Sequence, residues 1–221
     1  MNRLARVAAM TAVVAVAAAC GGSSSGNDNP TVAQKTCPQV PTPKATPQQY
    51  ASEPAMCIEP ANYTATIKTN QGTIVATLDG AKAPHTVNSF NFLAGQGYFN
   101  NSPCHRLVTQ GIFVLQCGDP TGTGTGGPGY TIPDENLTGA TYPAGTLAMA
   151  NTGQPHTGGS QFFFCYADTP LPPQYTPFGH VTQGLDVLKA IAANGDDGSN
   201  GPGDGKPKKP VIIESFTVAK A

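Results

Sequence analysis

The sequence has no tryptophan, and only 11% of its 221 residues are charged. The net charge is −1 at pH 7, so nothing attracts nucleic-acid phosphates and we expect no nucleic-acid partner. No CxxC pair occurs, and the six cysteines and four histidines show no zinc-like spacing. We therefore expect neither a metal nor a cofactor.

The sequence also lacks the common catalytic motifs. Ser160 is not within a Gly-x-Ser-x-Gly elbow, which argues against a serine hydrolase. The glycine- and threonine-rich stretch 118–129 lacks the Gly-Lys-Ser/Thr of a phosphate loop, so we interpret it as a mobile surface loop. Asp134 and Glu135 follow a proline in a predicted turn, where we expect solvated carboxylates rather than an acid–base pair. The chemistry has to work without these groups.

Glycine (26) and proline (21) are abundant, which favours loops and short strands over helical bundles. Helices are predicted after Pro84, where apolar residues repeat until Gly95, and from Leu185 to Asn194. Stretch 196–209 is predicted to be a long polar loop. β-prone runs predict strands at 63–69, 73–78, 107–108, 112–115, 146–151, 161–166 and 211–218. These elements alone favour a β-barrel or sandwich with helices at its ends.

The first residues have the pattern of an export signal. Two arginines precede an apolar run at 7–19, which is too short to span a bilayer comfortably. The run ends in small residues before Cys20 and resembles a bacterial lipoprotein signal, in which this cysteine is lipidated. We expect residues 1–20 to direct export, with anchoring through Cys20 to the outer face of the cell membrane. Ala17 replaces the usual leucine, which leaves cleavage and secretion as the alternative.

Residues 21–60 are rich in Pro, Ser and Thr and bury little, so we expect a disordered tether. The alternative is an ordered extension on the domain, pinned by a disulfide between Cys37 and Cys57. The pairing of the five cysteines after Cys20 stays open, and their odd number leaves at least one unpaired or bonded to another chain. The five are Cys37, Cys57, Cys104, Cys117 and Cys165. Cys104 and Cys117 could face each other across a hairpin, and we expect Cys165 to be a buried free thiol.

The stretch 104–119 contains Arg106, the only arginine beyond residue 6. A hairpin here would place Arg106 near Gln116, beside the apolar Phe113 and Val114. A fixed cation in an apolar groove suits a neutral peptide and could stabilise a half-rotated X–Pro bond. This isomerisation needs no nucleophile, base or metal.

Five motifs occur together in the last two thirds of the chain. They are His105-Arg106 with Phe113, Gln116-Cys117-Gly118-Asp119, Met149-Ala150-Asn151, Gly159-Ser160-Gln161-Phe162-Phe163 and Pro177-Phe178-Gly179-His180-Val181. The set resembles the cyclophilins, which are peptidyl-prolyl cis-trans isomerases. The resemblance implies a mainly β fold, an eight-stranded antiparallel barrel capped by two α-helices, formed by residues 61–221. The whole chain looks like the exported, tail-bearing cyclophilins of actinobacteria.

By position, the resemblance implies that Arg106 is catalytic. It implies that the substrate is bound by Phe113, Val114, Gln116, Ala150, Asn151, Gln161, Phe163, Leu171 and Tyr175. Gln116 matches the residue that orients the arginine, and Ala150 and Asn151 match a strand that binds substrate through backbone and side chain. Stretch 169–175 replaces a segment that usually contains tryptophan, so we expect weak cyclosporin binding with isomerase activity retained.

The leading hypothesis is a monomeric, surface-tethered isomerase that binds proline-containing peptides and helps exported proteins fold. One alternative is a slow-turnover peptide-binding or adhesive module, suggested by the altered 169–175 rim. Another is a redox-regulated switch based on Cys104 and Cys117.

Overall fold

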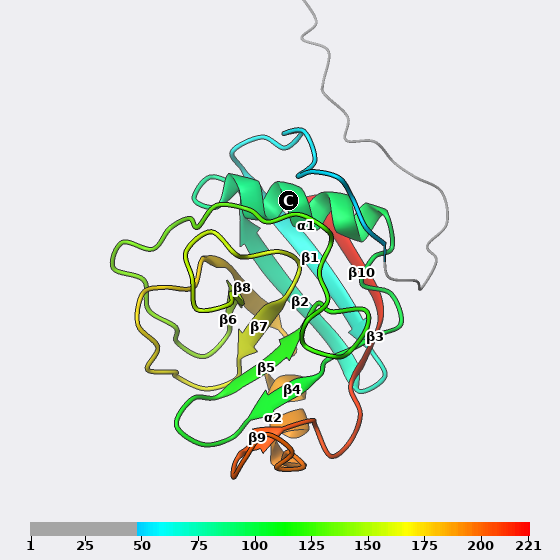
Figure 1. The fold of residues 1–221 in the computed structure, drawn as a ribbon, viewed down its shortest axis with the longest axis vertical. Helices are drawn as coiled ribbons and strands as arrows, with labels where there is room; N and C mark the ends of the chain where they lie inside the picture. Colours follow the sequence, from blue (N-terminus) through cyan, green and yellow to red (C-terminus); the bar gives the residue numbers. More distant parts are fainter. Residues whose placement is uncertain (1–47) are drawn as a thin grey trace, which may run out of the picture. The chain divides into compact units, whose positions relative to one another are not determined.

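The computed structural model describes residues 48–221, which form a curled antiparallel sheet with two helices (Figure 1). The sheet order is β3-β10-β1-β2-β8-β6-β7-β5-β4-β9. The strands are β1 (Asn62–Thr69), β2 (Gly72–Asp79), β3 (Ser102–Pro103), β4 (Arg106–Val108), β5 (Val114–Cys117), β6 (Thr146–Met149), β7 (Phe162–Cys165), β8 (Pro177–Gln183), β9 (Asp204–Gly205) and β10 (Ile212–Lys220). The predicted mainly β fold is confirmed, with two-residue strands β3 and β9 added at the sheet edges.

The β1–β2 hairpin shows how the sequence specifies the sheet. Side chains alternate between buried and partly exposed along both strands, and the register pairs Thr66 with Val75. Gly72 has a φ of 141° at the turn, where a Cβ would lie 2.8 Å from Val187 of α2 (Leu185–Ala193). A glycine is therefore needed to close this hairpin against the helix.

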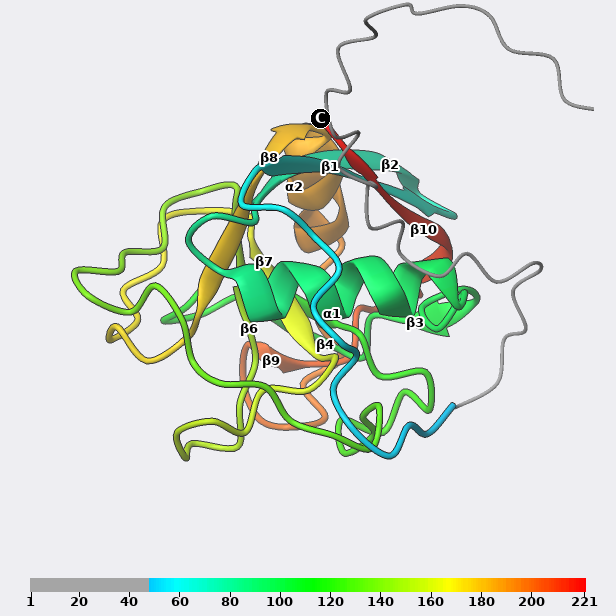
Figure 2. The same ribbon diagram turned by 90° about the horizontal axis from the view of Figure 1, so that it is seen from above.

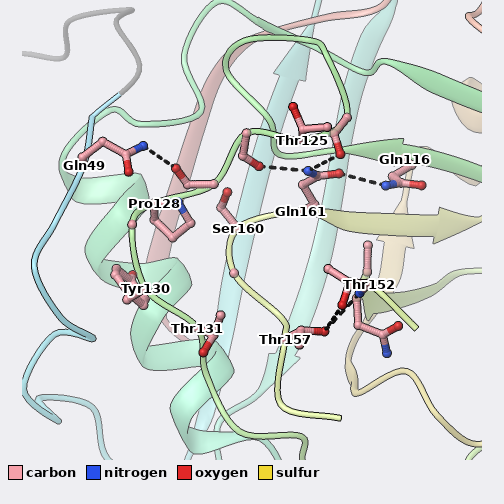
Figure 3. Close-up of a pocket in the computed structure, with 17 residues that line it drawn as sticks. Gln49, Gln116, Thr125, Pro128, Tyr130, Thr131, Thr152, Thr157, Ser160 and Gln161 are labelled. Atoms are coloured by element: carbon pink, nitrogen blue, oxygen red, sulfur yellow. Dashed lines mark hydrogen bonds between the residues drawn. The ribbon is translucent and has the colours of Figure 1, made fainter. Parts of the chain in front are cut away.

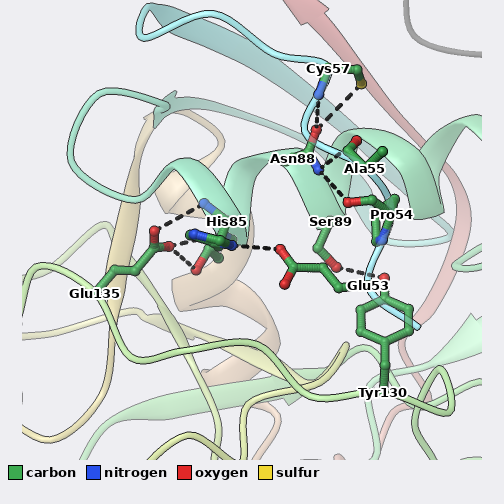
Figure 4. A network of polar contacts seen from close by, with 10 residues as sticks. Glu53, Pro54, Ala55, Cys57, His85, Asn88, Ser89, Tyr130 and Glu135 are labelled. Atoms are coloured by element: carbon green, nitrogen blue, oxygen red, sulfur yellow. Dashed lines mark hydrogen bonds and ion pairs between the residues drawn. The ribbon is translucent and has the colours of Figure 1, made fainter.

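Helix α1 (Pro84–Gly95) starts with the predicted proline in its first turn. Ala83 gives no side-chain cap, and Glu135 from a distant loop accepts hydrogen bonds from His85 N at 2.9 Å and Thr86 N at 2.9 Å (Figure 4). The prediction that Glu135 is a solvated turn residue is therefore wrong. Its carboxylate caps the helix in place of the local side chain that the sequence lacks.

The core lies between the curled sheet and the helices, which lie at opposite ends of it (Figure 2). Phe90 of α1 is fully buried at the centre of an aromatic cluster. Its ring contacts those of Phe99, Phe162, Phe178 and Phe216. Strand β8, which was not predicted, carries Phe178 and joins β2 to β6. Within residues 48–221 no helix combines the length and apolar character needed to cross a bilayer.

Residues 48–60 pack on the domain, as the alternative of an ordered extension predicts. Tyr50 contacts the ring of Phe92 edge-to-face at 4.9 Å between centroids, and Cys57 N donates to Asn88 Oδ1 at 3.0 Å (Figure 4). Cys57 is disulfide-bonded. Residues 1–47 lie outside the described part of the chain, so the export signal, lipidation of Cys20 and the pairing with Cys37 stay predictions.

Candidate active site

Four strands bring the central site residues into one row. Arg106 of β4 pairs with Gln116 of β5, which pairs with Phe163 of β7, which pairs with Ala148 of β6. Directly paired residues lie on the same face of a sheet, and alternate residues on opposite faces. The neighbouring row, Leu107, Leu115, Phe164 and Leu147, faces the main core. The predicted proximity of Arg106 and Gln116 across a hairpin is confirmed.

An apolar cluster lies on the same face as this row. It comprises the buried Val108, Val114, Tyr142, Ala148, Phe163 and Cys165, with Ile112, Ala140, Ala150, Leu171 and Tyr175 packed against it. The Phe163 and Tyr175 rings meet edge-to-face at 5.6 Å between centroids. The structure thus brings together five of the predicted substrate-binding residues, Val114, Ala150, Phe163, Leu171 and Tyr175.

The structure does not bring Phe113 into this cluster. Its ring contacts Tyr166 at 6.0 Å between centroids and packs against the main core. Strand alternation explains this, because Val114 points to the apolar cluster and its neighbour therefore points away. Ile112, two residues before Val114, packs on the cluster instead and was missed from the sequence.

A chain of amides leads away from the arginine. Arg106 Nη1 donates to Gln116 Oε1 at 3.4 Å, and Gln116 Nε2 donates to Gln161 Oε1 at 2.9 Å. Gln161 Nε2 in turn donates to the carbonyl oxygens of Gly124 and Gly126 (Figure 3). Both predicted glutamines are therefore held in defined orientations beside the arginine.

The other side of the guanidinium is bound by Asp204 of β9. Arg106 Nε donates to Asp204 Oδ1 at 2.8 Å and Nη2 donates to Oδ2 at 2.5 Å. The hydrogen bond from Arg106 holds the pKa of Asp204 below its ordinary value, and the same bond raises the pKa of Arg106. The sequence placed Asp204 in a featureless polar loop and gave no sign of this contact.

Loop 118–129, which supplies the carbonyls for Gln161, is built around Asp119. This buried carboxylate accepts hydrogen bonds from Thr121, Thr123, Gly124 and Gly126. Burial alone would raise the pKa of Asp119, but these bonds outweigh burial and lower the pKa to about 2. The loop therefore has an organised interior rather than the purely mobile character predicted for it.

A cavity of about 900 Å³ opens beside the row and is lined by Gln116, Ala150, Asn151 and Gln161 (Figure 3). Asn151 Nδ2 donates to Gln174 O at 2.8 Å, and its Oδ1 accepts from Gly153 N at 3.0 Å. These two bonds fix the orientation of the side chain and leave one N–H of its amide unused, so its role in binding substrate stays a prediction. The backbone N–H and C=O of Asn151 make no hydrogen bond within residues 48–221, so they can pair with an extended peptide.

The N-terminal extension forms part of the cavity wall, which sequence reasoning missed. Gln49 Nε2 donates to Gly127 O at 2.7 Å (Figure 3). Tyr50 N donates to Pro128 O at 2.8 Å. Both acceptors belong to the 118–129 loop. The extension therefore holds this loop at Gly127 and Pro128, next to the carbonyls that bind Gln161.

A disulfide joins two residues of the main core near the site. Cys104 and Cys117 form it, one of the pairings left open; Cys117 directly follows Gln116, and Cys104 precedes Arg106 by two residues. Cys165 is free and buried, as predicted, and burial raises the pKa of its thiol to about 12. In the described part of the chain, no three His, Cys, Asp or Glu side chains are grouped as metal ligands.

Comparison with known proteins gives a family match over most of the chain. The family described as cyclophilin type peptidyl-prolyl cis-trans isomerase/CLD matches residues 64–218. Probable peptidyl-prolyl cis-trans isomerase B of Mycobacterium leprae is 48% identical over 174 residues, which cover 72% of this chain and 58% of the relative. A peptidyl-prolyl cis-trans isomerase of Helicobacter pylori is 44% identical over 131 residues, covering 58% of this chain and 78% of the relative. The chain thus spans little more than half the length of its mycobacterial relative.

Solved structures show the same fold. A cyclophilin type peptidyl-prolyl cis-trans isomerase of Cryptosporidium parvum has a TM-score of 0.64 and 30% sequence identity, covering 72% of this chain and 99% of its own. The same protein solved in the presence of the dipeptide Ala-Pro gives a TM-score of 0.63 and 31% identity, with the same coverage.

Proposed function

We propose, since this chain belongs to the cyclophilin-type peptidyl-prolyl cis-trans isomerase family, that it accelerates rotation about X–Pro bonds in other polypeptides. One observation carries the proposal: Arg106, Gln116 and the apolar cluster around Phe163 share one face of the sheet. A cation beside an apolar surface suits a proline ring and the amide that precedes it.

The apolar cluster acts on the ground state. A planar X–Pro amide is stabilised by resonance, and its rotation barrier is about 18–20 kcal/mol. Its carbonyl oxygen hydrogen-bonds well to water, so transfer to a dry surface removes part of the stabilisation of the planar form. Phe163, Val114 and Leu171 provide that surface for the proline ring.

Arg106 acts on the twisted state. When resonance is broken, the prolyl nitrogen regains a lone pair that can accept a hydrogen bond, and a fixed guanidinium stabilises this state over either planar isomer. Lowering the barrier by about 7 kcal/mol gives roughly five orders of magnitude in rate. Gln116 keeps the guanidinium oriented, and the backbone of Asn151 holds the peptide.

The proposed substrates are proline-containing segments of unfolded exported proteins. The Cryptosporidium protein solved with Ala-Pro supports a proline-containing ligand for the fold. Because the 169–175 segment has no tryptophan, we further propose weak cyclosporin binding. An inhibition titration that gave tight, stoichiometric inhibition would contradict it.

The proposed location is the outer face of the cell membrane, with the chain monomeric and anchored through lipidated Cys20; secretion after cleavage is the alternative. The support is the apolar run before Cys20. Fractionation and mass measurement of the mature protein test this location, since Cys20→Ser should move a lipoprotein from the membrane to the medium. Size-exclusion chromatography with light scattering tests the monomer.

Proline-peptide exchange measured by NMR on the full chain tests the function. Arg106→Ala should lower kcat/KM by about a hundredfold, the loss typical of removing one donor to a transition state. Lys206→Ala is the matched control. Lys206 lines a cavity together with Arg106, and its replacement by alanine removes one positive charge, as Arg106→Ala does. An unchanged rate in Arg106→Ala would show that the catalytic assignment is wrong.

A slow-turnover binding module is the second candidate, favoured by the contact between Arg106 and Asp204. The carboxylate of Asp204 already accepts hydrogen bonds from two nitrogens of the guanidinium. Arg106 is therefore a weaker hydrogen-bond donor to the substrate. Tight binding of proline peptides with exchange close to the uncatalysed rate would support the binding module over the enzyme.

A further inference from the structure

We infer that Asp204 is a positioning residue for Arg106: it holds the guanidinium side-on, so that one edge of the group remains directed at the bound X–Pro amide. This inference rests on the proposed function and extends it to a residue that lies 98 positions after Arg106 in the sequence.

The first support is the count of donors. A guanidinium has five N–H groups. Asp204 takes one from Nε and one from Nη2, and Gln116 takes one from Nη1. One N–H therefore remains on each terminal nitrogen. These two N–H groups are the donors that the inference assigns to the twisted amide.

The second support is that Asp204 is itself held in place. It lies in β9, in register with Val108 of β4, so its side chain is on the same face as Arg106 and diagonal to it. Asn200 Nδ2 donates to Asp204 Oδ1 at 3.1 Å. A carboxylate on an unattached loop would have neither the register with Val108 nor the hydrogen bond from Asn200.

The third support is the way loop 196–209 is attached to β4. Thr109 N donates to Gly203 O at 2.8 Å, and Thr109 Oγ1 donates to Asp196 Oδ2 at 2.7 Å. Gly205, the partner of Leu107, leaves no room for a Cβ, which would lie 2.2 Å from Asp197 Oδ1. The loop is thus packed to bring one carboxylate to one guanidinium.

The pair is suited to orientation rather than to stability. Its side chains are 36% and 24% exposed, and ion pairs at this exposure contribute little to the free energy of unfolding. An arginine side chain has many rotamers, however, and a bidentate contact selects one of them. Variants of Asp204 should therefore fold and show their effect in catalysis.

The main test measures kcat and KM for proline-peptide exchange on the full chain. Asp204→Ala should lower kcat/KM about tenfold through kcat, because Arg106 contributes in the transition state. Asp204→Asn should lie between Asp204→Ala and wild type, and Asp204→Glu should recover part of the loss. Glu214→Gln, an exposed carboxylate on β10, controls for net charge and should leave both constants unchanged.

A second background separates positioning from a general effect on the fold. In Arg106→Lys, which cannot make the bidentate contact, adding Asp204→Ala should change kcat/KM less than about twofold. Equal losses in both backgrounds, an unchanged rate in Asp204→Ala or a faster one would overturn the inference.

A spectroscopic readout needs no activity. The chain has three arginines, so the Nε–H signal of Arg106 can be assigned by its loss in Arg106→Lys. We expect it to be shifted and slow to exchange in wild type and to become solvent-like in Asp204→Ala. If the wild type does not isomerise but shows this shift, the proposed function fails while the contact stands; an active wild type whose signal is insensitive to Asp204→Ala refutes the positioning role alone.

Discussion

Loops 118–129 and 196–209 contact opposite ends of the hydrogen-bonded chain Arg106–Gln116–Gln161, and both loops are organised by carboxylates. In loop 118–129 the hydrogen bonds to the Asp119 carboxylate come from N–H and hydroxyl groups of the loop itself. The loop contacts the site only through neutral backbone carbonyls, which accept hydrogen bonds from Gln161. In loop 196–209 Asp197 accepts from the backbone of Ser199 and Lys206, and a second carboxylate, Asp204, reaches the site. One loop therefore positions an amide and the other positions a charge.

The largest expected effect is on stability in loop 118–129. Asp119→Ala removes a buried acceptor of six hydrogen bonds and should lower the free energy of unfolding by about 4 kcal/mol. Chemical denaturation measures the loss. Asp197→Ala is the control in the other loop and should cost less, because Asp197 is exposed and water can replace it. Equal losses would show that the two loops are not built differently.

The next effect concerns the covalent link at the base of loop 118–129. Replacing Cys104 and Cys117 together by alanine opens a loop with a sequence separation of 13 and should lower the free energy of unfolding by about 3 kcal/mol. Pairing of β5 with β7 still holds Gln116 in the variant. The activation free energy derived from kcat should therefore change by less than the free energy of unfolding does.

This double variant also tests the redox switch, because it leaves the disulfide of Cys57 intact. A switch requires that reductant changes the rate of the wild type and not that of the variant. Equal wild-type rates with and without reductant would remove the switch.

A smaller effect follows from the amide that joins loop 118–129 to the site. Gln161→Leu keeps the size of the side chain but loses its bonds to Gln116, Gly124 and Gly126, and should lower kcat/KM by about tenfold. Gln49→Ala is the control, because Gln49 binds the same loop at Gly127 without touching the row. If Gln49→Ala cost as much, the role of Gln161 would be only to hold the loop.

The features predicted correctly from the sequence are those that depend on residues close together in the chain. The pairing of Arg106 with Gln116 follows from a short hairpin, and α1 follows from Pro84 and an apolar period. The resemblance to the cyclophilins then named five members of the cluster around Phe163. Strand β8, by contrast, was not predicted.

What the sequence missed depends on distant contacts or on the exact phase of a strand. Asp204 lies among several similar polar residues, and nothing local distinguishes it from Asp197. Glu135 caps α1 from a loop 49 residues after Thr86. Phe113 was assigned to substrate binding by its position in a motif, but strand alternation gives that face to Ile112 and Val114.

The smallest expected effects are on pH dependence. Asp119 and Asp204 both have a lowered pKa, the first to about 2. An acid whose pKa is lower in the folded state stabilises the protein above its unfolded pKa, and this stability is lost as the pH falls through the folded value. Stability from these groups should therefore persist down to about pH 4 and decline below it. Because Asp204 stays charged above that point, its contact with Arg106 should give no change in kcat between pH 8 and 5.

His105 adds a separate step at higher pH. Its ring lies beside Gly124, and neither ring nitrogen has a hydrogen-bond partner within residues 48–221. Burial lowers the pKa of His105 from its ordinary 6.5, with Arg106 acting in the same direction and Asp119 against it. The unfolded chain then binds a proton that the folded chain does not, so stability should begin to fall below about pH 6.5. In His105→Phe this step should vanish while the decline below pH 4 remains, whereas His180→Gln on the exposed face of β8 should keep both; a step that survives in His105→Phe would assign it to another group.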